Sequence, residues 1–227
     1  MEENPRNEEL RNIFQRVAAE YGYRSADAEY LSTKDLKVRW QRSYDWISFQ
    51  VSDYLDDAPE EVLEGLARNL CERLSGKASE FSRALKDWVT RPEFCKQKQP
   101  VYIERSMGLL NEVKGEHKDL NDSLKRLQDA GLIGNLPQVY LTWEDSATNK
   151  MGHCSVLMRV VSVNTFLDSD DVPDYVLDYC LYKELLHIQI GYDPDGGMHE
   201  EKHCQMCRDY SKSIEADDWL KNREVYA

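Results

Sequence analysis

The 227-residue sequence lacks an excess of positive charge and lacks any long hydrophobic run. Its 42 acidic residues outnumber its 29 basic residues, and the formal net charge is −13 at pH 7. This balance argues against a nucleic-acid-binding protein, because affinity for phosphates depends largely on Lys and Arg. No apolar run approaches the roughly 18 residues that a membrane-spanning helix needs. The sequence therefore predicts neither nucleic acid nor a membrane as a partner.

Several motifs of secreted, metal-binding and nucleotide-binding proteins are also missing. The N-terminus MEENPRNEEL is acidic, whereas a signal peptide begins with basic residues followed by an apolar segment. Only Cys204 and Cys207 have the spacing of zinc ligands, and no second Cys-x-x-Cys completes a structural zinc site. There is no glycine-rich phosphate loop and no Gly-x-Ser-x-Gly motif. We therefore expect a cytoplasmic protein whose six cysteines are reduced thiols.

The sequence does contain helical and strand-like segments in alternation. β-Branched and aromatic residues predict strands at LKVRW, DWISFQVSDYL, QVYLTWED and SVLMRVVSVNTFL. Apolar periodicity, prolines and acidic first turns predict helices over residues 7–21, 59–74, 78–89 and 119–130, and over VPDYVLDYCLYKELLHI. Prolines also mark residues 92–100 as a linker. This pattern predicts an α+β fold.

The two halves of the chain resemble each other. VSDYLDDAPEEVLEGLARNL matches VNTFLDSDDVPDYVLDYCLYKEL if a two-residue gap is allowed before the proline, so that Pro59 pairs with Pro173. Trp40 and Trp143 each mark the preceding strand. Either any strand, loop and proline-initiated helix look alike, or the chain contains a duplication in which only the second copy kept chemically active residues. In both cases the chemistry lies in the second half.

The predicted helix after Pro173 carries the pentapeptide KELLH. Residues three and four apart share a helix face, so Lys183, Glu184 and His187 project from one side. With His in place of Lys183 the motif would be His-Glu-x-x-His, in which two imidazoles bind zinc and the glutamate activates a zinc-bound water. Twelve residues after His187, beyond the turn-rich segment GYDPDGG, His199 stands where a third ligand could come from.

Residues 138–210 resemble the SprT-like and related small zincin metallopeptidases. The resemblance rests on strands similar to VYLTW and VVSVNTFLD, on the KELLH helix, and on a His near the start of a following helix. It covers roughly a third of the chain. It implies Glu184 as the catalytic base, His187 and His199 as zinc ligands, and a peptide as the substrate.

Lys183 departs from the pattern of that family, and three interpretations are open. Zinc binds deprotonated donors, whereas an ordinary Lys is a cation, and two imidazoles fall short of the three protein ligands of a catalytic zinc site. In the first interpretation, His203 completes a rebuilt site with His187 and His199; the family usually has a packing aromatic residue at the position of His203. In the second, the ammonium group replaces the metal by bonding to the histidines and pairing with Glu184. In the third, Lys183 reaches water and His187 is an ordinary helix residue.

We therefore expect a zincin-like metallopeptidase domain over residues 99–227. Residues 1–98 form a helical and partly β region, which is a degenerate repeat if the chain was duplicated. The expected function is that of a zinc metallopeptidase-like protein that Lys183 impairs or inactivates, with a cleft that still holds a peptide or protein segment. The alternative is an active zinc peptidase with the rebuilt site. The KELLH helix should pack on a sheet that includes the strands near Tyr140 and Val161, with His199 reaching back toward His187.

Overall fold

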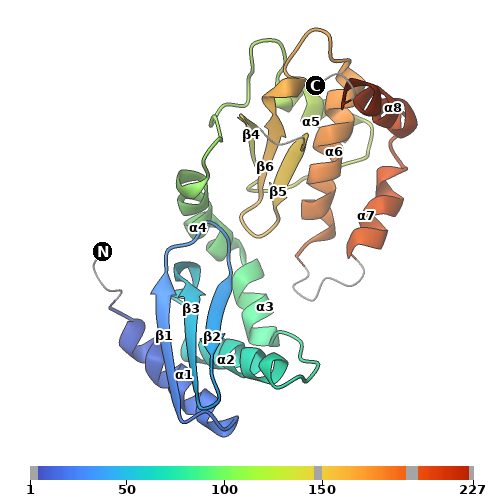
Figure 1. Ribbon diagram of the computed structural model, residues 1–227. Coiled ribbons are helices and arrows are strands. Elements are labelled where there is room, and N and C mark those ends of the chain that lie inside the picture. Colours follow the sequence, from blue (N-terminus) through green and yellow to red (C-terminus); the bar gives the residue numbers. More distant parts are fainter. Residues whose placement is uncertain (1–4, 146–149, 193–198, 225–227) are drawn as a thin grey trace. The chain divides into compact units, whose positions relative to one another are not determined.

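The computed structural model describes residues 5–145, 150–192 and 199–224, with only the backbone described for His199 and Glu224. The chain forms two compact units, Met1–Phe94 and Cys95–Ala227, whose elements are labelled in Figure 1. This boundary and the predicted one between residues 98 and 99 both fall within one helix, α4 (Pro92–Arg105). The fold is a mixture of helices and two small three-stranded sheets, which confirms the α+β prediction. None of the described helices is long and apolar enough to cross a membrane.

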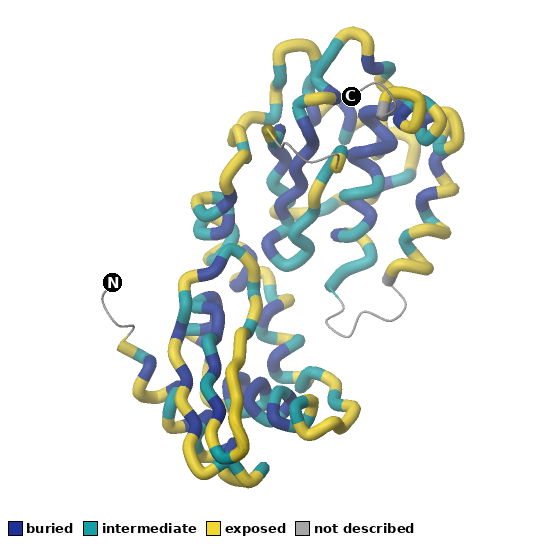
Figure 2. The backbone as a smooth tube through the Cα atoms, viewed as in Figure 1, coloured by how far each residue is buried: buried dark blue, intermediate teal, exposed yellow. Residues whose placement is uncertain are grey.

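The first unit is a three-stranded sheet with helices before and after it. Its elements are α1 (Asn7–Glu20), β1 (Ser25–Leu31), β2 (Val38–Arg42), β3 (Trp46–Ser52), the short 3-10 helix η1 (Asp53–Leu55), α2 (Glu60–Leu74) and α3 (Arg83–Thr90). The strand order is β1-β3-β2, with β1 parallel and β2 antiparallel to β3. Along β3 the buried residues are Ile47, Phe49, Val51 and Ser52, and the buried tracts of this unit are dark blue in Figure 2. Helices α1 and α2 pack against each other.

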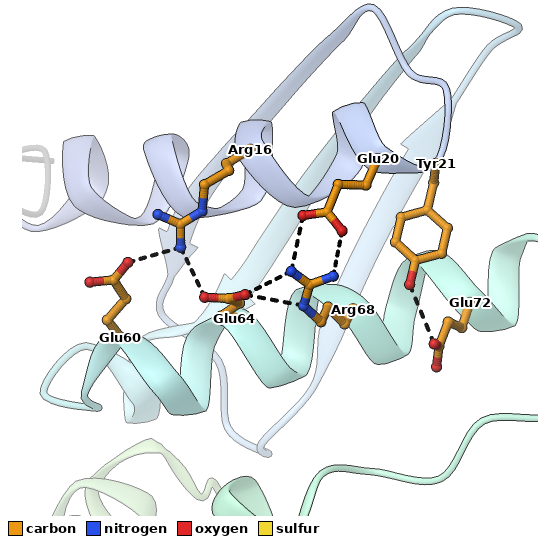
Figure 3. A network of polar contacts seen from close by, with 7 residues as sticks. All are labelled: Arg16, Glu20, Tyr21, Glu60, Glu64, Arg68 and Glu72. Carbon is orange, nitrogen blue, oxygen red and sulfur yellow. Dashed lines mark hydrogen bonds and ion pairs between the residues drawn. The ribbon is translucent and has the colours of Figure 1, made fainter.

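A network of ion pairs joins α1 to α2 (Figure 3). Arg68 donates to both carboxylate oxygens of Glu20, at 2.5 and 2.9 Å, and to Glu64 at 2.8 Å. Arg16 donates to Glu60 and to Glu64. The hydrogen bonds from Arg68 lower the pKa values of Glu20 and Glu64 below their ordinary values. Because these side chains are partly exposed, solvent screens each pair and its individual contribution to stability is small.

The second unit contains a sheet of the same size and three further helices. Its elements after α4 are α5 (Leu120–Asp129), β4 (Tyr140–Glu144), β5 (Gly152–Ser155), β6 (Val160–Asn164), the 3-10 helix η2 (Thr165–Leu167), α6 (Asp174–Ile190), α7 (His199–Cys207) and α8 (Ser213–Glu224). The strand order is β4-β6-β5, with β4 parallel and β5 antiparallel to β6. The KELLH helix α6 packs on β5 and β6, which confirms its predicted contact with this sheet.

The two units share one topology. In each, a helix precedes a parallel edge strand, an antiparallel edge strand and a central strand, and a 3-10 turn then leads to a long helix that begins after a proline. The side chain of Ser52 caps η1 and the side chain of Asn164 caps η2, each by accepting from the backbone N–H two residues later. The pairing of Pro59 with Pro173 therefore joins equivalent positions, at the N-caps of α2 and α6.

In both units an ion pair joins the helix before the sheet to the long helix after it, at equivalent positions. Counted from the prolines, Asp178 of α6 corresponds to Glu64 of α2. Asp178 accepts hydrogen bonds from Arg126 of α5 at 2.6 and 2.8 Å and from Ser123 at 2.6 Å, as Glu64 accepts from Arg16 of α1. Shared topology and equivalent pairs both support an internal duplication.

One proposed correspondence between the halves is wrong. On the central strand β3, Val51 pairs with Tyr30 of β1 and with Val38 of β2. On the central strand β6, the equivalent Val163 pairs with Trp143 of β4 and with Gly152 of β5. Trp143 therefore corresponds to Tyr30. Trp40 lies on the antiparallel strand, opposite Phe49.

Several element boundaries also differ from the prediction. Residues 92–100, expected to be a linker, belong to helix α4, because Arg91 is extended and Pro92 begins a new helix with Pro100 inside it. The helix expected from residue 78 begins at Arg83, after the Ser82 side chain caps it. The segment SVLMRVVSVNTFL contains the end of β5, a turn, β6 and η2 rather than one strand. Strand β1 was not predicted, although SADAEYL alternates in burial.

Candidate functional site between β5 and α6

Helix α6 carries the KELLH residues through the centre of the second unit. Pro173 sets its N-terminus, and Asp174 in the first turn pairs with Lys118 at 2.6 Å, where an acid also suits the helix dipole. Ten of its seventeen residues are buried, because the helix contacts α5, α7, α8, β5 and β6. Lys183, Glu184 and His187 are only partly buried and line a cavity.

The cavity lies between β5 and α6, and residues of α8 line another side of it. Its volume is about 620 Å³. The residues that line it are Lys150, Met151, Gly152, His153, Cys154 and Val156 on and around β5, Cys180, Lys183, Glu184 and His187 on α6, and Asp217, Leu220 and Lys221 on α8. Charged groups, thiols and apolar side chains therefore share one space.

Glu184 lies directly beneath β5. A Cβ atom built on Gly152 would come within 2.7 Å of the Glu184 Cγ, so the close approach depends on glycine at this strand position. Burial raises the pKa of Glu184 to about 7, an effect that the charges of Lys183 and Lys150 partly oppose. The predicted catalytic residue thus combines a cavity position with a pKa suited to proton transfer near neutral pH.

Lys183 occupies the first position of the motif, and its side chain lies over an aromatic ring. Its Nζ lies 4.6 Å from the centroid of the Tyr179 ring, a cation–π contact. In the part of the chain that the structure describes, no carboxylate oxygen lies within 4 Å of this Nζ, so the proposed pair with Glu184 is not formed. The Lys183 carbonyl oxygen accepts a hydrogen bond from His203 Nε2 at 2.8 Å.

His203 of α7 lies on His187 of α6. The two ring centroids are 4.0 Å apart and the ring planes differ by 8°, so the rings are stacked. Because a carbonyl oxygen only accepts, the bond to Lys183 places a proton on His203 Nε2 and leaves Nδ1 toward Cys207 Sγ, at 3.7 Å. The structure therefore brings together two of the three predicted histidine ligands. The side chain of His199, the third, lies outside the described residues.

The described side chains in this arrangement do not fit a zinc ion. Zinc lies about 2 Å from an imidazole nitrogen along its lone pair, in the plane of the ring. Two stacked and nearly parallel rings have no nearby point that lies in both planes, so His187 and His203 cannot bind one ion as they stand. The Nε2 of His203 is also committed to the Lys183 carbonyl. Within the described ranges no three His, Cys, Asp or Glu side chains are grouped to hold a metal.

Four further His and Cys side chains of the second unit are poor zinc ligands in their present positions. His153 Nε2 lies 3.3 Å from the hydroxyl oxygen of Tyr102. Cys204 is exposed, whereas Cys154 and Cys207 are more enclosed. Burial raises the pKa of the Cys154 thiol, and it raises that of Cys207 to about 11, so both stay protonated at neutral pH.

Sequence reasoning missed the residues that complete the cavity. Lys150, Asp217 and Lys221 come from segments that carry no motif, and nothing in their spacing connects them to KELLH. Gly152 was missed because the predicted strand began at Ser155, whereas β5 begins at Gly152.

Comparison of the chain with models of protein families, with curated proteins and with solved structures finds no match.

Proposed function

We propose that the second unit is a peptidase-like domain, similar to the SprT-like zincins, that binds an extended protein segment without using zinc. The observation that carries this proposal is the stacked pair of His187 and His203 beside Lys183. At the positions where a zincin would gather imidazoles around an ion, this chain has an ammonium group held over Tyr179 and two histidines packed face to face. The order of helix, strands and KELLH helix supports the zincin-like comparison.

The edge of β5 supports the binding of an extended segment. β5 is an outer strand of its sheet and pairs with β6 alone among the described strands. The Asn164 N–H donates to the Met151 carbonyl, so residues 151 and 164 form a hydrogen-bonded pair. Because such pairs alternate in an antiparallel ladder, the backbone groups of Gly152 and Cys154 point away from β6. A peptide can add to that edge as a further strand, a common mode of peptide recognition.

One observation favours the alternative of an active peptidase. Glu184 lies in the cavity with a pKa raised to about 7 by burial, as a general base requires. That alternative needs His187 and His203 to separate and His199 to join them around zinc. We favour the zinc-independent function because the contacts of Lys183 and His203 oppose that rearrangement.

Peptide binding at the β5 edge can be tested with the whole chain in the presence of a chelator. An array of random-sequence nonapeptides is probed with the wild-type protein and with Cys154→Pro, which removes the outward N–H but no bond to β6. Cys154→Val is the matched control, because it changes the side chain and keeps the N–H. We expect a set of peptides bound by wild type and by Cys154→Val, and lost in Cys154→Pro. Equal binding by all three proteins, or no binding by any, contradicts the proposal.

A further inference from the structure

We propose that the cavity between β5, α6 and α8 binds a carboxylate group of the peptide through Lys150, Lys183 and Lys221. This inference rests on the proposed function, and it adds the chemical class that the site selects. The carboxylate is either the C-terminus of the peptide or the side chain of an Asp or Glu residue, and the experiment below distinguishes the two.

The lining of the cavity is positive in a chain that is strongly negative. Three lysines, from three different segments, face two acids, Glu184 and Asp217, although the chain as a whole carries a formal charge of −13. Asp217 already accepts a hydrogen bond from the Tyr179 hydroxyl at 3.2 Å. None of the three lysines lies within 4 Å of a carboxylate oxygen in the ranges that the structure describes. The cavity therefore has positive charge to offer to an anionic ligand.

Lys183 is the most enclosed of these cations. It is partly buried, whereas Lys150 and Lys221 are exposed. Its ammonium group has the Tyr179 ring on one side, and its carbonyl is fixed by His203 of α7. A partly desolvated cation that lies over an aromatic ring, with no carboxylate oxygen within 4 Å in the described residues, gains substantially from a carboxylate, because charge-assisted hydrogen bonds replace lost hydration. A peptide carboxylate thus takes the place that a metal-bound group has in a zincin.

The size and position of the cavity suit the end or a side chain of a bound strand. Its volume of about 620 Å³ falls within the range of roughly 300–1,000 Å³ for small-ligand sites. Met151, Val156 and Leu220 give it apolar surface next to the charged groups. Gly152 and Cys154, whose backbone groups face outward, also line it, so a strand added to β5 has the cavity beside it.

The first unit offers an internal comparison, because its equivalent positions cannot form this site. The strand register places Val38 where the second unit has Gly152. Counted from the prolines, Asn69 and Leu70 stand at the positions of Lys183 and Glu184. Asn69 is buried and donates to the Ser79 hydroxyl at 2.9 Å. Of the two described sheets with their long helices, only the second therefore has both a lysine at the position of Lys183 and a glycine that leaves room beside the edge strand.

The test uses the nonapeptide array in three formats, all lacking internal acids except where stated. One set ends in a free carboxylate, one ends in an amide, and one ends in an amide and contains a single internal Glu. Each is probed with wild type, Lys183→Met, a Lys150→Met, Lys221→Met double variant, Cys154→Pro and the control Lys212→Met. Lys212 is a suitable control because its Nζ also lies over a tyrosine, at 5.0 Å from the Tyr175 centroid, but outside the cavity.

We expect wild type and Lys212→Met to bind one carboxylate-bearing set at least tenfold more tightly than the plain amide set, and Lys183→Met to lose that preference. Preference for the free-carboxylate set identifies the C-terminus, and preference for the internal-Glu set identifies an acidic side chain. Equal binding of all three sets, still sensitive to Cys154→Pro, overturns the carboxylate inference and leaves the proposed function standing. Absence of binding to every set overturns both. An unchanged preference in both Lys183→Met and a Lys150→Met, Lys221→Met double variant also overturns the inference.

Discussion

Gly152 of β5 and Glu184 of α6 lie so close together that residue 152 has no room for a side chain. A Cβ atom on residue 152 would lie 2.7 Å from the Glu184 Cγ and 3.1 Å from the backbone oxygen of Ser162. The glycine thus lets the helix approach the edge strand and lets the glutamate lie against it, which forms one wall of the cavity.

Gly152→Ala should therefore destabilise the second unit, by about 1–3 kcal/mol, the usual cost of adding a methyl group to a close-packed site. The measurement is native-state hydrogen exchange of the β6 amides, which reports on this unit alone. Gly134→Ala is the control, since the nearest atom to its added Cβ is 4.0 Å away. Adding Glu184→Ala to Gly152→Ala should recover part of the loss, and strict additivity of the two changes would contradict the proposed fit.

The stability of the second unit should fall as the pH rises from about 4.5 to about 7. Burial raises the pKa of Glu184 from 4.5 to about 7, so across this range the folded state holds a proton that the unfolded state has released. The loss is at most about 3.5 kcal/mol, because each pKa unit corresponds to about 1.4 kcal/mol. Glu184→Gln should remove this part of the pH dependence and stabilise the protein at pH 8. Parallel stability profiles of the two proteins between pH 4 and 8 would rule out this assignment.

The equivalent acids Asp178 and Glu64 should differ in their importance to folding. The Asp178 side chain is 9% exposed and accepts three hydrogen bonds, two of them from Arg126, whereas the Glu64 side chain is 31% exposed and shares its partners with Glu20 and Glu60. Asp178→Ala should destabilise the second unit by about 2 kcal/mol, since hydrogen bonds to charged groups are worth about 1.5–3 kcal/mol. Glu64→Ala should cost the first unit less than half of that. Thermal unfolding followed by NMR, with resolved signals from each unit, measures the loss of stability in each variant. A larger loss in Glu64→Ala than in Asp178→Ala would contradict the prediction.

Local patterns were enough to predict much of the second unit. The helix after Pro173, the strands β4 and β6 and the packing of KELLH on the sheet follow from proline position, acidic first turns and β-branched runs. These signals are local, so each can be interpreted from a few neighbouring residues. The same signals misplaced α4, because Pro92 begins a helix and Pro100 lies inside it.

Non-local features could not be predicted in the same way. Strand order decides that Trp143 corresponds to Tyr30, and order depends on pairing across the sheet. The stacking of His203 on His187 depends on how α7 packs on α6, and the spacing of residues along the sequence does not determine that packing. The lysines of the cavity come from separate segments and acquire a common role only in the folded unit.

The central claim is that the KELLH site works without zinc, and zinc binding by the whole chain tests it most directly. Metal content after purification, followed by zinc titration at pH 7.5, is measured for wild type, Lys183→His and His203→Ala. We predict less than stoichiometric, weak zinc in wild type, no change in His203→Ala, and a gain in affinity in Lys183→His, which supplies the missing imidazole. Tight, stoichiometric zinc in wild type that disappears in His203→Ala would contradict the account and establish the rebuilt histidine site.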